Sequence, residues 1–512
     1  MNYLKKFCIQ YSSIDSTIKE IDQKKILDEI KKNVNCQNSL EDENLINLLN
    51  CAKILSRNEH QTEFLMDIKL IDKYFDQLLS FTDSQVNCEI LKFVYNMVKQ
   101  SKNFRKIYGL EILENFVSYY SNFNFSNINE NSLLRMHIIF FLTCDVSCRN
   151  YFQHDIEKYL RLCNLFNDAF ASLNYNPSSH SSNEFPISFL SRIKQFCKII
   201  TTILYNILNF SKNDKMNVET CQKFYKPIGK MLTIVFNSYV IFNEMDELEL
   251  KLFLNTINLI LCVPIELDSF EKYILPIFYQ NSVIHNRINL LLQFLNDKII
   301  TKEIYISDDI IPKIVILIKI CSKHKEIRKY CRLKIFPYLN KEIDNLPEIG
   351  NSMRNKICQL LIKSDRDVKN VVGNLLLVLF KNSVKKIIKY TGYGNAAGFL
   401  TNTMFIEKSM QQNKQMCDYS SSSDDSETDY YSNNKDRFNP ITGRIEDAKE
   451  PPKFVSEEHK AYEAKKLLDA IDKMNRNGII QTISSEDGKF VPKNVAEMLH
   501  NVDPHDIESE SD

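Results

Sequence analysis

The sequence has little glycine and proline and no tryptophan: its 512 residues include Gly 10, Pro 13 and Trp 0. Both turn-forming residues fall well under their usual shares of about 7% and 5%. A β-sandwich or a doubly wound α/β fold needs many tight turns, in which these residues are concentrated. Helices joined by short polar links need few. Because 44% of the residues are hydrophobic, the chain can bury a core, and the composition favours an all-α protein.

The chain also lacks an excess of either charge, with Lys+Arg 65 against Asp+Glu 65. A nucleic-acid binder normally carries a basic stripe that neutralises phosphates, and none is present. The 14 cysteines form no Cys-x-x-Cys pair and lie mostly in apolar runs, as reduced, buried cysteines do. The N-terminus lacks the apolar core of a signal peptide. The longest apolar run, Leu375 to Phe380, is too short to cross a membrane. We therefore expect a cytoplasmic protein with no nucleic-acid partner and no integral membrane segment.

Residues 1 to about 400 consist of apolar segments separated by polar breaks, such as LINLLNCAKILS, CEILKFVYNMVK and LLRMHIIFFLTC. Apolar residues recur at spacings of three and four, which indicates helices. Most segments are apolar over more than half of their circumference, which is typical of helices that neighbours cover on two or three sides.

The segments also repeat at a regular distance. Alignment places Ile54, Asn96 and Ile139 at matching positions, 42 and 43 residues apart, and Asn206 follows after 67. A polar insertion at 172–186, which we predict to be a loop, accounts for the longer step. A period of about 40–47 residues is typical of HEAT and armadillo repeats. We predict an all-α, right-handed armadillo/HEAT-type solenoid over residues 1–410. The pattern alone leaves an unrelated helical bundle as the alternative.

The composition changes after residue 400. Residues 411–456 are polar, acidic and rich in serine, which predicts a flexible linker. Residues 457–482 follow the pattern of one amphipathic C-terminal helix, which must dock on the solenoid or on a partner. Residues 483–512 are predicted to be an acidic, disordered tail.

Three of the ten glycines lie in one short string, KYTGYGNAAGFL, at Gly392, Gly394 and Gly398. The string satisfies the dinucleotide pattern G-x-G-x-x-G/A, but the preceding segment has a helical period where a strand is required. We instead predict a corner between two helices, where Gly392 and Gly394 take positive φ and Gly398 allows close helix packing. The sequence shows no catalytic triad, phosphate loop or metal-ligand spacing. We therefore expect neither an enzyme nor a bound cofactor or metal.

The string IKYTGYGNAAGFL resembles a signature of the synembryn family, which are chaperones and guanine-nucleotide exchange factors of heterotrimeric G-protein α subunits. RKYCRLKIFPYL and PEIGNSMRNKICQLL before it agree in order, as do NPITGRIE (Asn439–Glu446) and EEHKAYEAKKLLDAIDKMNRNGIIQ (Glu457–Gln481) after it. The resemblance implies an armadillo/HEAT solenoid that binds the GDP-bound or nascent Gα subunit. It also implies a monomer that holds Gα nucleotide-free until GTP binds. Gα would recruit this monomer to the cell cortex or plasma membrane.

The resemblance also suggests which residues contact Gα. Lys53 and Arg57 are four residues apart and match basic positions of the concave groove, and Asn96 matches a groove asparagine. Basic side chains and amides suit the carbonyls and the carboxylate at the C-terminus of a helix. Three further candidates are Arg135, Asn206 and Asn258. The two asparagines either bind a partner's backbone or tie adjacent repeats together, since a buried asparagine must be hydrogen-bonded.

Three serines in the acidic segment, Ser421, Ser422 and Ser426, each have an aspartate three residues later. This is the pattern of an acidophilic kinase of the casein kinase 2 type, and the family carries phosphosites in this segment. A phosphate there would pin the linker to a basic patch on the solenoid. The alternative is an unmodified, solvated linker.

A generic α-solenoid adaptor, which binds a helical peptide in its concave groove, is the other reading of the whole chain. It explains the repeats and the groove. It does not explain why the glycine string, NPITGR and the terminal helix occur in this order.

Overall fold

The computed structural model describes residues 2–13, 18–35, 42–79, 84–173, 187–209, 218–239, 245–279, 284–300, 307–400, 428–446, 466, 483–486 and 489–492. The chain forms two compact units. Unit 1 comprises Met1–Asn433 with Asn439–Arg444, and unit 2 comprises Asn434–Phe438 with Ile445–Asp512.

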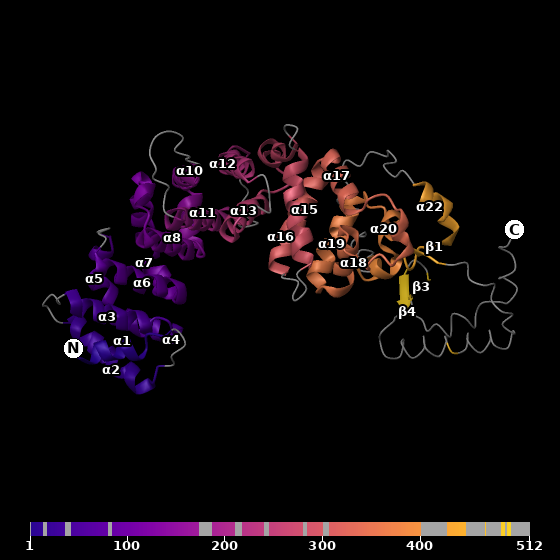
Figure 1. Ribbon diagram of the computed structural model, residues 1–512. Helices are drawn as coiled ribbons and strands as arrows, with labels where there is room; N and C mark the ends of the chain where they lie inside the picture. The colour runs from indigo at the N-terminus through magenta and orange to yellow at the C-terminus, as the bar shows by residue number, and fades with distance from the viewer. Residues whose placement is uncertain are drawn as a thin grey trace. The chain divides into compact units, whose positions relative to one another are not determined.

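Two rows of helices build unit 1 (Figure 1). In the first row each helix packs on the next one. Its members are α1 (Asn2–Gln10), α3 (Asp42–Leu55), α6 (Gln85–Gln100), α8 (Glu130–Leu142), α11 (Ile187–Leu208), α13 (Glu247–Asn258), α16 (Ser307–Lys323) and α19 (Arg366–Leu379).

The second row packs beside the first and shares contacts with it along its length, for example between α7 and α8 and between α10 and α11. Its members are α2 (Glu20–Asn35), α5 (Leu70–Leu79), α7 (Lys102–Tyr119), α9 (Val146–Gln153), α10 (Ile156–Leu173), α12 (Val218–Ser238), the π-helix η5 (Phe270–Ile274), α14 (Pro276–Tyr279), α15 (Ile284–Ile300) and α18 (Met353–Lys363). Short elements lie between these helices: α4 (Glu59–Asp67), η1 (Tyr120–Asn122), η2 (Phe125–Asn127), η4 (Leu259–Cys262), α17 (Lys325–Ile335), η6 (Lys341–Asp344) and α20 (Val384–Thr391).

This stack of helical hairpins is an all-α solenoid, as the sequence predicted. Ile54, Asn96, Ile139 and Asn206 lie on α3, α6, α8 and α11, four consecutive helices of the first row, which confirms the repeat alignment. The polar insertion follows the end of α10 at Leu173, and its residues 174–186 lie outside the described ranges.

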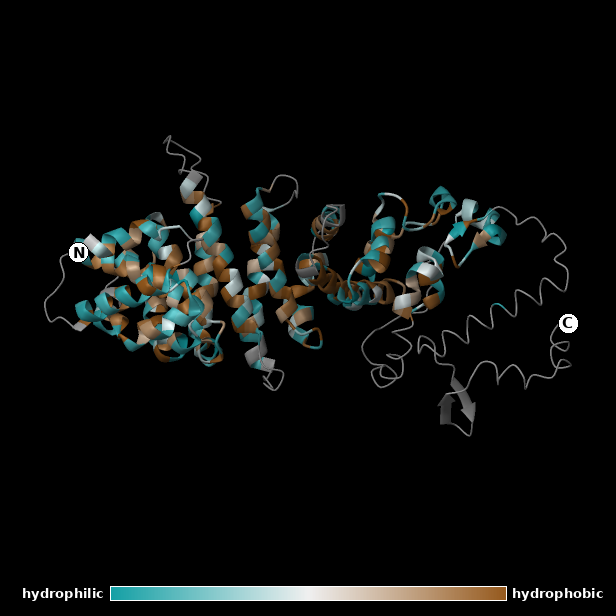
Figure 2. Cartoon of the chain, turned by 90° about the horizontal axis from the view of Figure 1, so that it is seen from below, coloured by the Kyte–Doolittle hydropathy of each residue, from teal (hydrophilic) through white to brown (hydrophobic). Residues whose placement is uncertain are grey.

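Local sequence signals set the helix ends. Ser84 caps α6 by accepting from the Asn87 amide, and Asn129 and Ser132 form a capping box at the start of α8. The helices of unit 1 carry both apolar and polar residues along their length (Figure 2). Large apolar side chains such as Phe104, which is 1% exposed, are buried. Burial of one such side chain contributes roughly 1.5–3 kcal/mol, so packing between rows stabilises each hairpin.

The last part of unit 1 corrects the prediction of a flexible linker at 411–456. Residues 411–427 and 447–456 lie outside the described ranges, but residues 428–433 pack on the solenoid. The Thr428 hydroxyl donates to the Leu339 carbonyl, and Tyr431, on α22 (Asp429–Asn433), is 6% exposed. The Lys389 ammonium lies 4.2 Å from the centre of the Tyr431 ring. The prediction was wrong here because it relied on average polarity, which two adjacent tyrosines do not change much.

Unit 2 contains the 3₁₀ turn η7 (Lys435–Arg437) and an antiparallel hairpin of β3 (Ile483–Glu486) and β4 (Lys489–Pro492), with Ile483 opposite Pro492. The hairpin corrects the prediction of a disordered tail at 483–486 and 489–492, since these two segments pair through their backbones, and the rest of 483–512 lies outside the described ranges. The strands β1 (Phe438–Asn439) and β2 (Arg444–Ile445) stand where the chain passes between the two units. The predicted helix at 457–482 lies outside the described ranges except for Lys466, which is helical.

Candidate functional site

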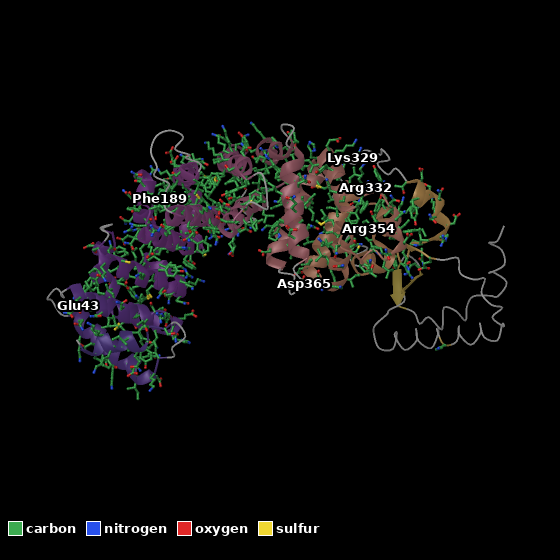
Figure 3. All side chains as sticks on the ribbon, in the orientation of Figure 1. Glu43, Phe189, Lys329, Arg332, Arg354 and Asp365 are labelled. Carbon is green, nitrogen blue, oxygen red and sulfur yellow. The ribbon has the colours of Figure 1, made fainter. Side chains whose placement is uncertain are left out.

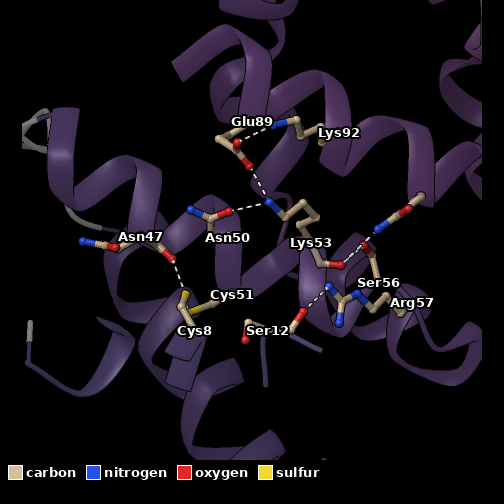
Figure 4. A network of polar contacts seen from close by, with 11 residues as sticks. Cys8, Ser12, Asn47, Asn50, Cys51, Lys53, Ser56, Arg57, Glu89 and Lys92 are labelled. Atoms are coloured by element: carbon tan, nitrogen blue, oxygen red, sulfur yellow. Dashed lines mark hydrogen bonds and ion pairs between the residues drawn. The ribbon is translucent and has the colours of Figure 1, made fainter. Parts of the chain in front are cut away.

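Lys53, in the last turn of α3, lies at the centre of a charged cluster on the first row (Figure 4). Its ammonium is 2.6 Å from Glu89 Oε2 and 2.5 Å from Asn50 Oδ1. The Lys92 ammonium contacts the other oxygen of Glu89 at 2.8 Å. Two ammonium groups thus share one carboxylate, and this cluster carries one net positive charge.

The geometry shifts the pKa values of the cluster in opposite directions. Burial acts to raise the pKa of Glu89, but hydrogen bonds from Lys53 and Lys92 outweigh it and hold that pKa below its ordinary value. The hydrogen bond to Glu89 raises the pKa of Lys92. Glu89 and Lys92 are therefore both ionised at neutral pH.

Arg57 has a structural role that the sequence did not reveal. Its guanidinium donates to the backbone carbonyls of Tyr11, Ser12 and Ser13, at 3.0–3.3 Å. These carbonyls follow the C-terminal end of α1, where backbone acceptors have no partner within the helix. Arg57 therefore fixes the chain that leaves α1 against the end of α3.

The three predicted asparagines all hold neighbouring helices of the first row together. Asn96 Nδ2 donates to the Lys53 carbonyl at 3.0 Å, and Asn206 Nδ2 donates to Thr143 Oγ1 at 3.2 Å. Asn258 Oδ1 accepts from the Lys313 ammonium on α16 at 3.1 Å. Each side chain is partly exposed. The structure thus shows the tie between repeats, and binding of a partner's backbone stays a prediction.

Arg135 does not reach the surface, which corrects its assignment as a groove residue. Its side chain is 0% exposed, and its guanidinium carbon lies 4.7 Å from the centre of the Tyr119 ring on α7. The side chain points toward the second row, where a cation–π contact stabilises its charge. A partner on the first row cannot contact it.

The glycine string lies against the NPITGR segment within unit 1. The Tyr393 amide donates to the Pro440 carbonyl at 2.9 Å, and the Gly394 amide donates to the Ile441 carbonyl at 3.0 Å. We call this pairing of residues 392–394 with 439–444 the glycine clasp. It joins two motifs that are about 45 residues apart in the sequence.

Two glycines make the clasp possible. Gly392 ends α20 with φ +75, and residues 393–400 are helical, so the predicted helix corner is confirmed. Gly443 has φ +74, and a Cβ there would lie 2.6 Å from Pro347 Cγ and 3.0 Å from Gly392 Cα. The prediction for Gly394 was wrong, because its φ is not positive. Close packing at Gly398 is also not found: among the described atoms, a Cβ there would meet nothing within 4 Å.

Tyr390, two residues before Gly392, anchors the clasp in the core. Its hydroxyl accepts from Arg332 Nη2 at 2.8 Å, and its carbonyl accepts from Arg354 Nε at 2.9 Å. Figure 3 shows these two arginines, from α17 and α18. Arg354 is 1% exposed, and burial lowers its pKa. The Asn395 side chain donates to Glu348 Oε2 at 2.8 Å, so it serves the fold of the clasp.

A basic cleft lies beside α17. Its volume is about 30 Å³, and no acidic side chain lines it. The cations that line it are Lys325, Arg328, Lys329, Arg332, Lys381 and Lys386. The predicted phosphosites Ser421, Ser422 and Ser426 lie outside the described ranges.

A family model described as guanine nucleotide exchange factor synembryn matches residues 48–489. The chain belongs to the synembryn family. The match includes both halves of the glycine clasp and the Lys53 cluster, whereas the backbone carbonyls that Arg57 binds precede it.

This synembryn is similar to several proteins named Chaperone Ric-8A. It is 34% identical over 267 residues to that of Xenopus tropicalis, covering 50% of this chain and 48% of the relative. It is 31% identical over 308 residues to that of Danio rerio, covering 59% and 54%. The chain thus spans about half the length of the curated relatives it matches. A crystal structure titled as an engineered protein gives a TM-score of 0.41 at 12% identity, covering 81% of this chain and 96% of that one.

The described part of this synembryn shows neither a membrane-spanning helix nor a metal-binding cluster. None of its helices is both long and apolar enough to span a bilayer. No group of three or more His, Cys, Asp or Glu side chains is arranged to hold a metal ion in those ranges.

Proposed function

We propose that this synembryn is a non-receptor guanine-nucleotide exchange factor and folding chaperone for heterotrimeric G-protein α subunits. The match to the family model over residues 48–489 carries the proposal, and the similarity to proteins named as chaperones supports it. It binds GDP-bound or nascent Gα, stabilises the nucleotide-free form and releases it when GTP binds. It works as a monomer in the cytoplasm, and Gα recruits it to the cell cortex or plasma membrane.

Exchange and chaperoning follow from a single binding preference. A protein that binds nucleotide-free Gα more tightly than nucleotide-bound Gα must weaken nucleotide binding by the same factor. GDP is therefore released faster from a Gα subunit that this protein binds. A nascent Gα subunit, which is unstable without nucleotide, is stabilised by the same binding. The protein therefore acts by binding, without covalent chemistry of its own.

The first row is the surface that we assign to the C-terminal helix of Gα. The net positive charge shared by Lys53, Glu89 and Lys92 suits a terminal carboxylate and the orphan carbonyls of a helix end. Asn96 and Asn206 each use Nδ2 on a neighbouring helix, which leaves Oδ1 as the atom that would accept a donor from Gα. Asn258 and Arg57 complete this predicted surface. Each would contact Gα through side-chain atoms that make none of the hydrogen bonds described above.

We further propose that an acidophilic kinase of the casein kinase 2 type phosphorylates Ser421, Ser422 and Ser426. The α17 basic cleft supports this, because its cations lie in the same unit as Thr428, which contacts Leu339 just after α17. A phosphate carries nearly two negative charges and three acceptor oxygens, which such a cleft would bind.

The test is GDP release from a purified Gα subunit of the same organism, with and without this protein. We expect faster release and a nucleotide-free complex that GTP dissociates. Lys53→Gln combined with Lys92→Gln should weaken the complex about tenfold, because it removes two charged contacts. Lys223→Gln, which changes an exposed lysine on the second row, should leave it unchanged.

Two results would count against the proposal. If no available Gα forms a complex or releases GDP faster, the chain is an α-solenoid adaptor for another helical partner. If release accelerates but the double variant binds as tightly as the wild type, the exchange activity stands and the assignment of the Lys53 cluster is wrong.

A further inference from the structure

A second charged site lies on the second row, away from the clasp and the Lys53 cluster. It is a cavity of about 560 Å³ lined by residues of α12, η5, α14 and α15. Its walls carry the cations Lys226, Lys230, Lys272 and Arg287, and no acidic side chain. The first-row surface assigned to Gα contributes no residue to it.

The positive charge of this cavity is not balanced by neighbouring acids. Lys226 and Lys230 are exposed and one turn apart on α12, where like charges repel. Among the described residues, two nearby carboxylates pair elsewhere: Glu219 with Lys223 at 2.8 Å, and Glu271, next to Lys272, with Lys323 at 2.9 Å. No ion pair joins Lys226, Lys230 or Lys272 to an acid within the part of the chain that the structure describes. An anion from outside the chain would relieve this repulsion.

Arg287 provides a fixed cation in the wall. Its Nη2 donates to Asn237 Oδ1 at 2.6 Å, and its Nη1 donates to the Ile277 carbonyl. Its Nε is buried and meets no hydrogen-bond acceptor among the described residues. Burial lowers the pKa of Arg287, which reflects the cost of holding this charge without an anion.

The backbone brings the lysines of two elements to one space. η5 is a π-helix, a rare conformation that is frequent at functional sites. A Cβ at Gly229 would lie 2.6 Å from the Tyr273 carbonyl, so only glycine lets α12 approach η5 this closely. That approach sets Lys272 of η5 in the same cavity as Lys226 and Lys230 of α12.

We propose that this cavity binds a small ligand that carries two or more phosphate groups. The volume falls within the range of about 300–1,000 Å³ that is usual for small-molecule sites. Lysines act as point charges toward phosphate, while the arginine fork binds phosphate oxygens in a fixed geometry. Thr233 and Asn237 add polar atoms to the lining. A soluble inositol phosphate and the headgroup of a phosphoinositide lipid share this chemistry.

The test uses the full-length protein and isothermal titration with inositol 1,4,5-trisphosphate. We expect saturable binding that weakens about tenfold or more in the double variant Lys226→Ala with Lys230→Ala, because two charge-assisted contacts are lost. Lys223→Ala is the matched control. It removes a lysine from the same helix, outside the cavity, and should bind as the wild type does. Inorganic phosphate should bind far more weakly than the trisphosphate.

Three results would overturn the proposal: no binding of the trisphosphate, equal affinity in the double variant, or equal affinity for inorganic phosphate. Phosphatidylcholine vesicles with and without phosphatidylinositol 4,5-bisphosphate then distinguish the sources. Tighter binding to the lipid-bearing vesicles identifies a headgroup, and binding of the soluble trisphosphate alone identifies a soluble ligand. No Gα is present in these assays, so their result is independent of the proposed exchange function.

Discussion

Gly392→Ala should open the glycine clasp while leaving the rest of the solenoid folded. At φ +75 and ψ 144, Gly392 has a backbone conformation that residues with a Cβ rarely adopt. Such a conformation costs about 1–3 kcal/mol. The new Cβ would also lie 3.0 Å from the Thr442 carbonyl oxygen, which must move by a few tenths of an ångström. We therefore expect a loss of about 2–3 kcal/mol at this site.

Amide hydrogen exchange measures this loss directly. The Tyr393 and Gly394 amides donate to carbonyls of the NPITGR segment, so they are protected only while the clasp is closed. A loss of about 2 kcal/mol should speed their exchange roughly 30-fold, since each 1.4 kcal/mol is a factor of ten. Amides in the middle of α6, far along the chain, should exchange as in the wild type.

Gly398→Ala is the matched control within the same string. Residue 398 is helical, and a Cβ there meets nothing within 4 Å among the described atoms. Replacement of a helical glycine by alanine contributes about 0.5–1 kcal/mol of stability. Unchanged protection of the two amides in Gly392→Ala, or equal loss in Gly398→Ala, would refute the reasoning. Because Gly392 and Gly443 are in contact, their alanine variants should also combine non-additively.

Three other changes test the structure. Glu89→Gln should cost about 1–2 kcal/mol at pH 7, because the carboxylate holds two lysines. Since the folded pKa of Glu89 is below its ordinary value, this difference is present above about pH 4.3 and should vanish as the pH falls further, which urea unfolding at several pH values measures. Arg57→Gln should speed amide exchange at the C-terminal end of α1 with little loss of helicity by circular dichroism, and unchanged exchange would contradict its bracing role. Gly373→Ala places a Cβ inside the Phe399 ring and should lower the free energy of unfolding by about 1–3 kcal/mol; Phe399→Leu should restore part of it, and a purely additive double variant would argue against the contact.

Arg57 changes how the first-row surface must be tested. A charge reversal at Lys53 and Arg57 together would weaken Gα capture for two reasons, because Arg57 also binds the carbonyls that follow α1. Substitution of Lys53 with Lys92 leaves that brace intact. It removes both lysines that share Glu89 but none of the contacts to the carbonyls that follow α1, so a loss of binding does not come from that brace.

Two segments that the structure shows as ordered carried sequence signals that the predictions did not use. Asp487-Gly488 lies between ISSE and KFVP, and an Asp-Gly dipeptide between two such segments favours a hairpin. Tyr430 and Tyr431 interrupt the polar stretch just where it packs on the solenoid, with Tyr431 buried. In both cases a prediction from average composition overlooked two residues that determine the local structure.

The sequence by itself determined the helices, their repeat and the corner at Gly392, because each depends on residues close together in the chain. Apolar residues that recur three and four positions apart form one face of a helix, and this face is buried whichever segment packs against it. The asparagines at Asn96 and Asn206 were likewise placed on the correct row by spacing alone.

Only the tertiary structure decided which groups meet. It buried Arg135 against Tyr119, gave Arg57 the carbonyls that follow α1, and laid NPITGR on the glycine string. It also gathered four cations from α12, η5 and α15 around one cavity. A backbone carbonyl accepts from any suitable donor, and an ammonium donates to any suitable acceptor. Which partner each one meets depends on how distant segments pack, which local spacing does not encode.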